Sequence, residues 1–158
     1  ALNQLLAHHG IVFKPEDLKV WVSSNPYQLG EFVAYDLNKV FQEVEENPTP
    51  TSVSDPKANI PEDPFLRTLA YRNYQRYRKL SIQITNAISS NGHVEQNLLQ
   101  EFILLNPDFW EAYYLVGKYN YQKGYDRLAL KAFLNAEKKE ITTVPDREEV
   151  ERYIRRLQ

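Results

Sequence analysis

The sequence contains no cysteine and no methionine. The absence of cysteine excludes disulfides, thiolate metal sites and cysteine nucleophiles, but a chain without thiols tolerates either redox state. There is also no run of about 18 apolar residues and no basic region followed by an apolar stretch at the N-terminus, so neither a membrane span nor a secretory signal is predicted. A soluble chain is expected, and a cytoplasmic and a periplasmic location both stay open.

Neither sign of charge predominates, since the sequence has 19 Lys and Arg residues and 21 Asp and Glu residues. Such a chain has no overall field that would draw it to nucleic acid or to an anionic membrane, so neither is expected as a partner. The sequence has no glycine-rich phosphate loop and no metal-ligand spacing. It therefore predicts no cofactor, no metal ligand and no catalytic residue, and it leaves the oligomeric state undecided.

Proline is present, and its distribution divides the chain. Five of the nine prolines fall between residues 47 and 64, among Thr, Ser, Asp and Asn. This composition is typical of a linker or a long surface crossing. We therefore predict an N-terminal segment over residues 1–46, a proline-rich linker over 47–63 and a helical domain over 64–158.

The N-terminal segment has the pattern of a small sheet. Residues 10–13, 18–22 and 31–35 are predicted strands, with a tight hairpin between the first two and a longer loop before the third. Residues 37–46 have one apolar helical face. Three short strands and one helix leave Trp21, Phe32 and Tyr35 without an apolar partner layer. Because residues 2–6 also begin a helical pattern without a cap, we expect the natural polypeptide to extend upstream.

After Pro64 the apolar residues recur at three- and four-residue steps. The spacing predicts helices over 65–89, with Asp63 as N-cap, and then over 94–105, 109–122, 126–140 and from 145 onward. Short loops between helices of this length make neighbours antiparallel. The expected fold class is thus α+β, with short antiparallel strands followed by an antiparallel helical stack.

Residues 106–137 carry the most specific pattern. Asn106 and Pro107, then the string WEAYYLVG over 110–117, and then Gly124, Ala129, Phe133 and Ala136 resemble a tetratricopeptide repeat. In this resemblance Gly117 and Ala129 are small positions where two helices approach closely, Tyr113, Val116 and Phe133 fill the space between the helices, and Ala136 lets the next helix pack. Asn120 stands where the repeat prefers a large apolar residue, and Ile141 stands where it prefers proline.

Four residues of the first repeat helix step by three, four and three, so they share one face: Glu111, Tyr114, Lys118 and Tyr121. In tetratricopeptide proteins this face lines the groove that holds peptides. The resemblance therefore implies a peptide segment or an upstream domain of the same protein as partner. A role in packing or in contact with solvent stays open for the same residues.

A second resemblance covers residues 1–46. The string HHGIVF over 8–13, then residues 18–24, then NPYQLGEFVAYDL over 25–37 are similar to the last strands of acyltransferase-like N-terminal-nucleophile hydrolases. This group includes acyl-coenzyme A:6-aminopenicillanate acyltransferase. It implies two sheets between helical layers and a cysteine, exposed by self-cleavage, that attacks the acyl carbon. No cysteine occurs here and residues 1–3 do not match a nucleophilic start, so the catalytic residues of such an enzyme would lie upstream.

Three further groups of residues have side chains that could form a site. His8 and His9 are adjacent, point apart and do not easily share a metal. Arg72, Arg76 and Lys79 share a helical face that the nearby tyrosines do not, which favours a solvated basic face over a grip on single-stranded nucleic acid. Glu45 and Glu46 border the linker with no pocket implied. Two function hypotheses remain, an interaction module and the C-terminal portion of an amide-processing hydrolase.

Overall fold

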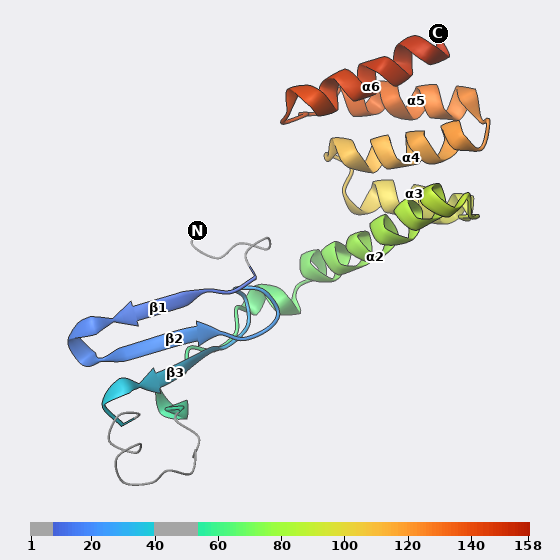
Figure 1. Ribbon diagram of the computed structural model, residues 1–158. Coiled ribbons are helices and arrows are strands. Elements are labelled where there is room, and N and C mark those ends of the chain that lie inside the picture. The colour runs from blue at the N-terminus through green and yellow to red at the C-terminus, as the bar shows by residue number, and fades with distance from the viewer. Residues whose placement is uncertain (1–7, 40–53) are drawn as a thin grey trace. The chain divides into compact units, whose positions relative to one another are not determined.

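The structure is a computed structural model that describes residues 8–39 and 54–158 (Figure 1). Three antiparallel strands precede a series of helices, which confirms the α+β class. The chain forms two compact units, Ala1–Thr68 and Leu69–Gln158. Among the described helices, none combines the length and the apolar character needed to cross a membrane.

The first unit contains a sheet with the strand order β1-β2-β3, made of β1 (Ile11–Lys14), β2 (Lys19–Ser23) and β3 (Phe32–Asp36). Each strand begins one residue later than its predicted range. The hairpin turn is a short 3-10 helix, η1 (Pro15–Asp17), followed by Leu18 in the left-handed region at φ 49°. In the register, Trp21 pairs with Val12 on one side and with Ala34 on the other.

The described part of the expected linker is bonded to this sheet. Ile60 and Ser54 form isolated bridges with Phe32 and Tyr35 of β3, and η2 (Pro56–Ala58) lies between them. The indole Nε1 of Trp21 donates to the Ala58 carbonyl oxygen at 2.8 Å. Residues 54–60 therefore belong to the sheet unit, because they pair with the edge of β3 and accept a hydrogen bond from the Trp21 side chain. Trp21, Phe32 and Tyr35 are half-buried.

Some predictions of this region fall outside the described residues. Residues 37–39 are helical, but the rest of the helix predicted over 37–46, including Glu45 and Glu46, is not described. The helical pattern predicted over residues 2–6 is also outside the described ranges. His8 and His9 are exposed.

The first predicted helix of the C-terminal part is interrupted. Asp63 does act as a cap, because its Oδ1 accepts from the Phe65 backbone N–H at 2.8 Å, but it caps the 3-10 helix η3 (Pro64–Arg67). Thr68 is extended, and its hydroxyl donates to the Phe65 carbonyl at 2.7 Å. The α-helix α2 (Leu69–Ser90) begins only after this residue. The division between the two units coincides with the interruption.

The second unit continues with α3 (Gln96–Leu105), α4 (Trp110–Gln122), α5 (Asp126–Glu137) and α6 (Val144–Leu157). These helices lie side by side in chain order (Figure 1). Gly124 between α4 and α5 has φ +73°, a conformation that glycine adopts without cost. At α6, the Thr143 hydroxyl accepts from the Asp146 N–H at 3.3 Å, and Pro145 occupies the first turn, where its missing N–H is not needed.

The close crossing predicted at Gly117 is confirmed. A Cβ atom added at Gly117 would lie 2.7 Å from Cε1 of the Phe133 ring on α5, and Ala129 and Phe133 are fully buried. Ala136 is also fully buried and shares a core cluster with Val150 and Ile154 of α6. Small residues on α4 and α5 thus bring three helices together around one aromatic ring.

Candidate functional site

The four residues predicted to share a face do lie on α4, and three of them contact α6. The Tyr114 hydroxyl donates to Oε1 of Glu149 at 2.5 Å, and Lys118 Nζ lies 3.8 Å from the same oxygen. The Tyr121 ring meets the Tyr153 ring edge-on, with 5.2 Å between centroids. Part of the predicted face is therefore engaged by α6, the last helix of the same chain.

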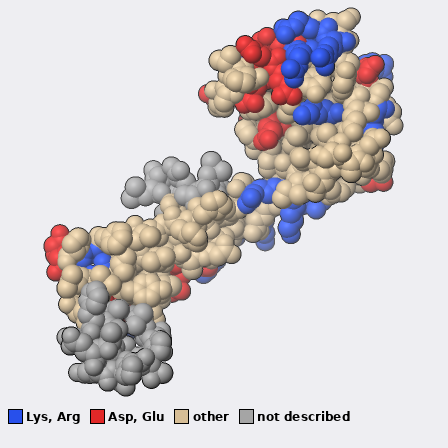
Figure 2. Space-filling view, viewed as in Figure 1, with Lys and Arg blue, Asp and Glu red and all other residues tan. Residues whose placement is uncertain are grey.

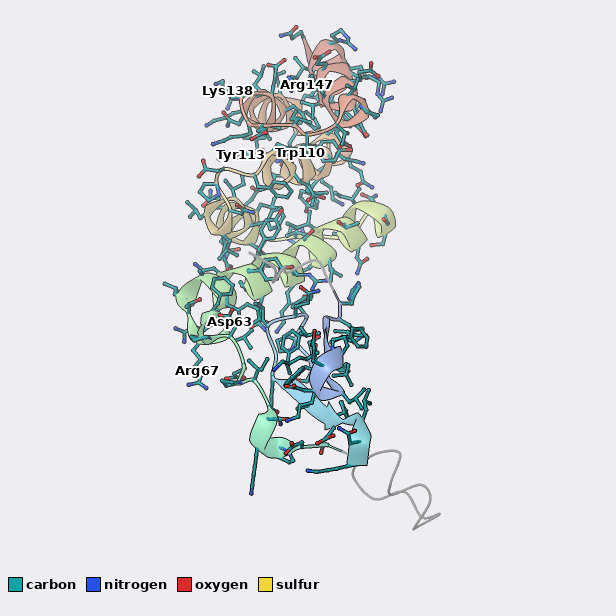
Figure 3. The ribbon with its side chains drawn as sticks, turned by 90° about the vertical axis from the view of Figure 1, so that its left-hand side faces the viewer. Asp63, Arg67, Trp110, Tyr113, Lys138 and Arg147 are labelled. Atoms are coloured by element: carbon teal, nitrogen blue, oxygen red, sulfur yellow. The ribbon has the colours of Figure 1, made fainter. Side chains whose placement is uncertain are left out.

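An aromatic cluster extends this contact into the core. The Trp110 and Tyr114 centroids are 5.4 Å apart, and Phe133 stacks on Tyr153 at 4.6 Å and 7°. Trp110 and Tyr113 stand on α4, while Arg147 belongs to α6 at the end of the stack (Figure 3). These ring contacts pack α4 against α5 and α6.

Glu111 differs from its three neighbours on the face. Its side chain is half-buried, and among the described residues it has no hydrogen-bond or ion-pair partner. Burial, and then the negative charge of Asp146 on α6, raise the pKa of the Glu111 carboxyl. The site therefore holds a carboxyl group that no cation of the described residues pairs with when it is ionised.

Tyr77 on α2 is a second polar group without a partner in this region. Its hydroxyl is buried and makes no hydrogen bond within the described part of the chain. Burial, and then the charge of Glu111, raise the pKa of Tyr77. Helices α2, α4 and α6 thus contribute Tyr77, Glu111 and Asp146 to one electrostatically connected region.

Charged side chains of both signs gather over the α6 end of the unit (Figure 2). Glu149 is the central acceptor there. Its Oε1 accepts the hydrogen bond from Tyr114, forms the ion pair with Lys118 and lies 3.6 Å from Nη2 of Arg152. Burial, and then the hydrogen bond to Glu149, raise the pKa of Tyr114. The sequence pattern alone missed Glu149, Asp146 and Tyr153, although the step of three to four residues between them was a signal of one α6 face.

Arg76, the central residue of the basic face predicted on α2, is paired with an acidic side chain of α3. Both oxygens of Glu101 on α3 accept from Arg76, at 2.7 and 2.8 Å. This bidentate pair removes the central cation from the face that Arg72, Arg76 and Lys79 were predicted to share. Over residues 8–39 and 54–158 there is no group of three His, Cys, Asp or Glu side chains that could hold a metal ion.

Comparisons with protein-family models, with curated proteins and with solved structures found no match to this chain.

Proposed function

We propose that the helical unit is a protein-interaction module whose α4 face binds a peptide segment, from a partner or from another part of the same protein. The observation that carries this proposal is the half-buried, unpartnered carboxylate of Glu111 beside an aromatic cluster. A cation brought by a ligand would stabilise the ionised carboxylate and relieve its repulsion by Asp146. The expected ligand is a segment with a lysine or arginine.

The aromatic side chains support the same ligand. Tyr114 lies one turn from Glu111 on α4, and Tyr121, further along the same face, is 37% exposed. An aromatic ring can pack against the methylene groups of a Lys or Arg side chain and can attract its charged group through a cation–π contact. A peptide with one basic residue next to an apolar residue thus matches both the charge and the surface of this face.

Short random peptides can be selected for binding to the intact chain. The enriched peptides are then titrated into the labelled chain, and nuclear magnetic resonance shifts locate the residues that bind them. Enriched peptides should carry Lys or Arg and should shift resonances of α4 and α6. Glu111→Gln should weaken binding about tenfold, which corresponds to about 1.4 kcal/mol. The matched control is Glu137→Gln, which removes the same charge from an exposed position of α5. Enriched peptides without basic residues, or equal effects of the two variants, would contradict the proposal.

A second candidate is the C-terminal part of an acyltransferase-like N-terminal-nucleophile hydrolase, with its catalytic residues upstream. It is favoured by the exposure of Ile11, Val12 and Phe13 on β1, at 56%, 47% and 68%. Apolar side chains on a strand are expected to face another layer of structure. Hydrolysis of N-acyl amides should then require the full-length protein and its presumed N-terminal cysteine, and turnover by the present chain would exclude this arrangement.

A further inference from the structure

The two outer strands of the sheet differ in how their outward backbone groups are used. On β3, Phe32 exchanges two backbone hydrogen bonds with Ile60, at 2.9 and 3.0 Å. Ala34 accepts from the Asp55 N–H at 2.8 Å and donates to Oδ1 of Asn59 at 2.9 Å. The segment that follows β3 in the structure thus closes this edge. Figure 1 shows β1 at the opposite edge of the same sheet.

The hydrogen-bond pattern of β1 leaves its outer side bare. The Ser23 N–H donates to the Gly10 carbonyl at 2.9 Å, which makes these two residues a bonded pair of the β1–β2 ladder. Bonded and non-bonded pairs alternate in an antiparallel ladder, so Val12 is bonded to β2, whereas the N–H and C=O groups of Ile11 and Phe13 point away from it. These four outward groups have no hydrogen-bond partner among residues 8–39 and 54–158.

The side chains of β1 do not protect this edge. Ile11, Val12 and Phe13 are all exposed, although successive residues of a strand point to opposite faces of the sheet. Native edge strands are commonly protected by charges, prolines or bulges within the strand. The one charged residue of β1, Lys14, stands at its end and forms an ion pair with Asp17. The outer side of β1 is therefore a short, neutral edge that is apolar on both faces.

We propose that β1 pairs with β1 of a second copy of this chain, antiparallel and about a two-fold axis at Val12. In this register Ile11 of each copy exchanges two hydrogen bonds with Phe13 of the other, so every outward group on both strands has a partner. The edge requires a strand that is apolar on both faces and has free groups two residues apart, and β1 itself meets both conditions. Lys14 lies opposite Gly10 of the second copy, so no like charges oppose each other.

The neighbouring two-fold registers satisfy fewer groups. An axis one residue further along the chain places Pro15, which has no N–H, opposite Ile11 of the second copy. An axis one residue earlier pairs Phe13 with His9, whose carbonyl already accepts from Nε2 of Gln28 at 2.9 Å. The contact is short, so it belongs to the small class of interfaces that associate weakly. It involves the sheet unit alone and is independent of the function proposed for α4.

The test follows amide hydrogen exchange of the labelled full chain by nuclear magnetic resonance at increasing protein concentration, with analytical ultracentrifugation in parallel. The Ile11 and Phe13 amides should exchange freely in dilute solution. Their exchange should slow about tenfold where about nine-tenths of the chain is paired. The Val12 amide is the internal control, because it is bonded within its own sheet and should change much less. A chain that stays monomeric, or Ile11 and Phe13 amides already protected in dilute solution by another segment of the chain, would overturn the proposal.

Charge variants test the position of the axis. Val12→Lys and Val12→Glu each place two like charges opposite each other, so either variant alone should stay monomeric. An equimolar mixture should form heterodimers, because opposite charges then meet at the axis. The control is Leu18→Lys, which adds a charge at an exposed position of the hairpin turn and should leave the pairing unchanged. Dimers of Val12→Lys alone, or a mixture that stays monomeric, would overturn the proposed register.

Discussion

At the scale of single residues, the helical unit depends on a few positions where size or charge is sharply constrained. Gly117 is the clearest case for size, because the Phe133 ring occupies the space of a side chain there. Glu111 is the clearest case for charge, because it is half-buried with no cationic partner among the described residues. The two residues lie on different sides of α4, so they can be tested separately.

Gly117→Leu should destabilise the helical unit by about 1 to 3 kcal/mol or more, because a side chain at this crossing must displace Phe133 or separate α4 from α5. Chemical denaturation followed by circular dichroism measures the loss. Lys118→Ala is the control, since it removes a 3.8 Å ion pair with Glu149 and a cation–π contact with the Tyr114 ring from a partly exposed position and should cost about 1 kcal/mol. Equal losses from the two variants would show that the crossing is not at Gly117.

Glu111→Gln should stabilise the fold at neutral pH, with a gain that fades in acid. A carboxyl whose pKa is raised by folding contributes stability that is fully present below its unfolded pKa, about 4.3, and is lost as the pH rises through the raised folded value. The amide has no such loss. Thermal melts over this pH range measure the difference. Glu137→Gln, at an exposed position, should show no comparable trend, and a similar trend there would point to overall charge instead.

At the scale of elements, one tyrosine ties α4 to the turn between α2 and α3. The Tyr119 hydroxyl accepts from the Val94 N–H at 2.9 Å and donates to the Val94 carbonyl at 3.2 Å. Both residues are buried. Lys123 adds a second tie, because its Nζ lies 2.8 Å from the Asn91 carbonyl oxygen. The α2–α3 turn is therefore fixed by the C-terminal half of α4.

Tyr119→Phe should cost about 1 to 3 kcal/mol, because it leaves the Val94 N–H and carbonyl buried without partners. Hydrogen exchange at the Val94 amide, together with the free energy of unfolding, measures the effect. Tyr113→Phe removes a hydroxyl whose hydrogen bond to the Pro107 carbonyl is exposed, so water can replace it and the loss should be small. A Val94 amide that stays fully protected in Tyr119→Phe would contradict the assignment.

At the scale of the whole molecule, the two units differ in how far along the chain their contacts reach. Helices α2 to α6 follow one another through short connections, and the most extensive helix contacts are those of α5 with its chain neighbours α4 and α6, while α2 packs against both α3 and α4. In the sheet unit, β3 is joined to residues 54–60, beyond the part of the chain that is not described. Local contacts favour independent and rapid folding.

Residues 69–158 alone should therefore fold and melt cooperatively, with a helical circular dichroism spectrum. The full chain, measured in parallel, should show the same transition for its helical part. A flat melt of the fragment would mean that the helical unit needs the preceding residues, and the division at Thr68 would then be wrong.

Much of the fold could be predicted from the sequence, since helix positions depend on short-range periodicity and caps. The spacing of apolar residues placed α4 within one residue, and Gly117 marked the crossing with Phe133. The predicted ends of helices were less accurate where a local turn or cap replaces helical hydrogen bonds. The helix expected from residue 65 is broken at Thr68, and α5 ends three residues before the predicted 140.

The sequence by itself determined which residues share a helical face, because side-chain direction repeats with the backbone period. It therefore identified Glu111, Tyr114, Lys118 and Tyr121 as one set. Only the tertiary structure decided that Glu149 and Tyr153 engage three of them and that residues 54–60 join the sheet. These features arise between segments far apart in the chain, where packing and hydrogen bonding, rather than local periodicity, select the partners.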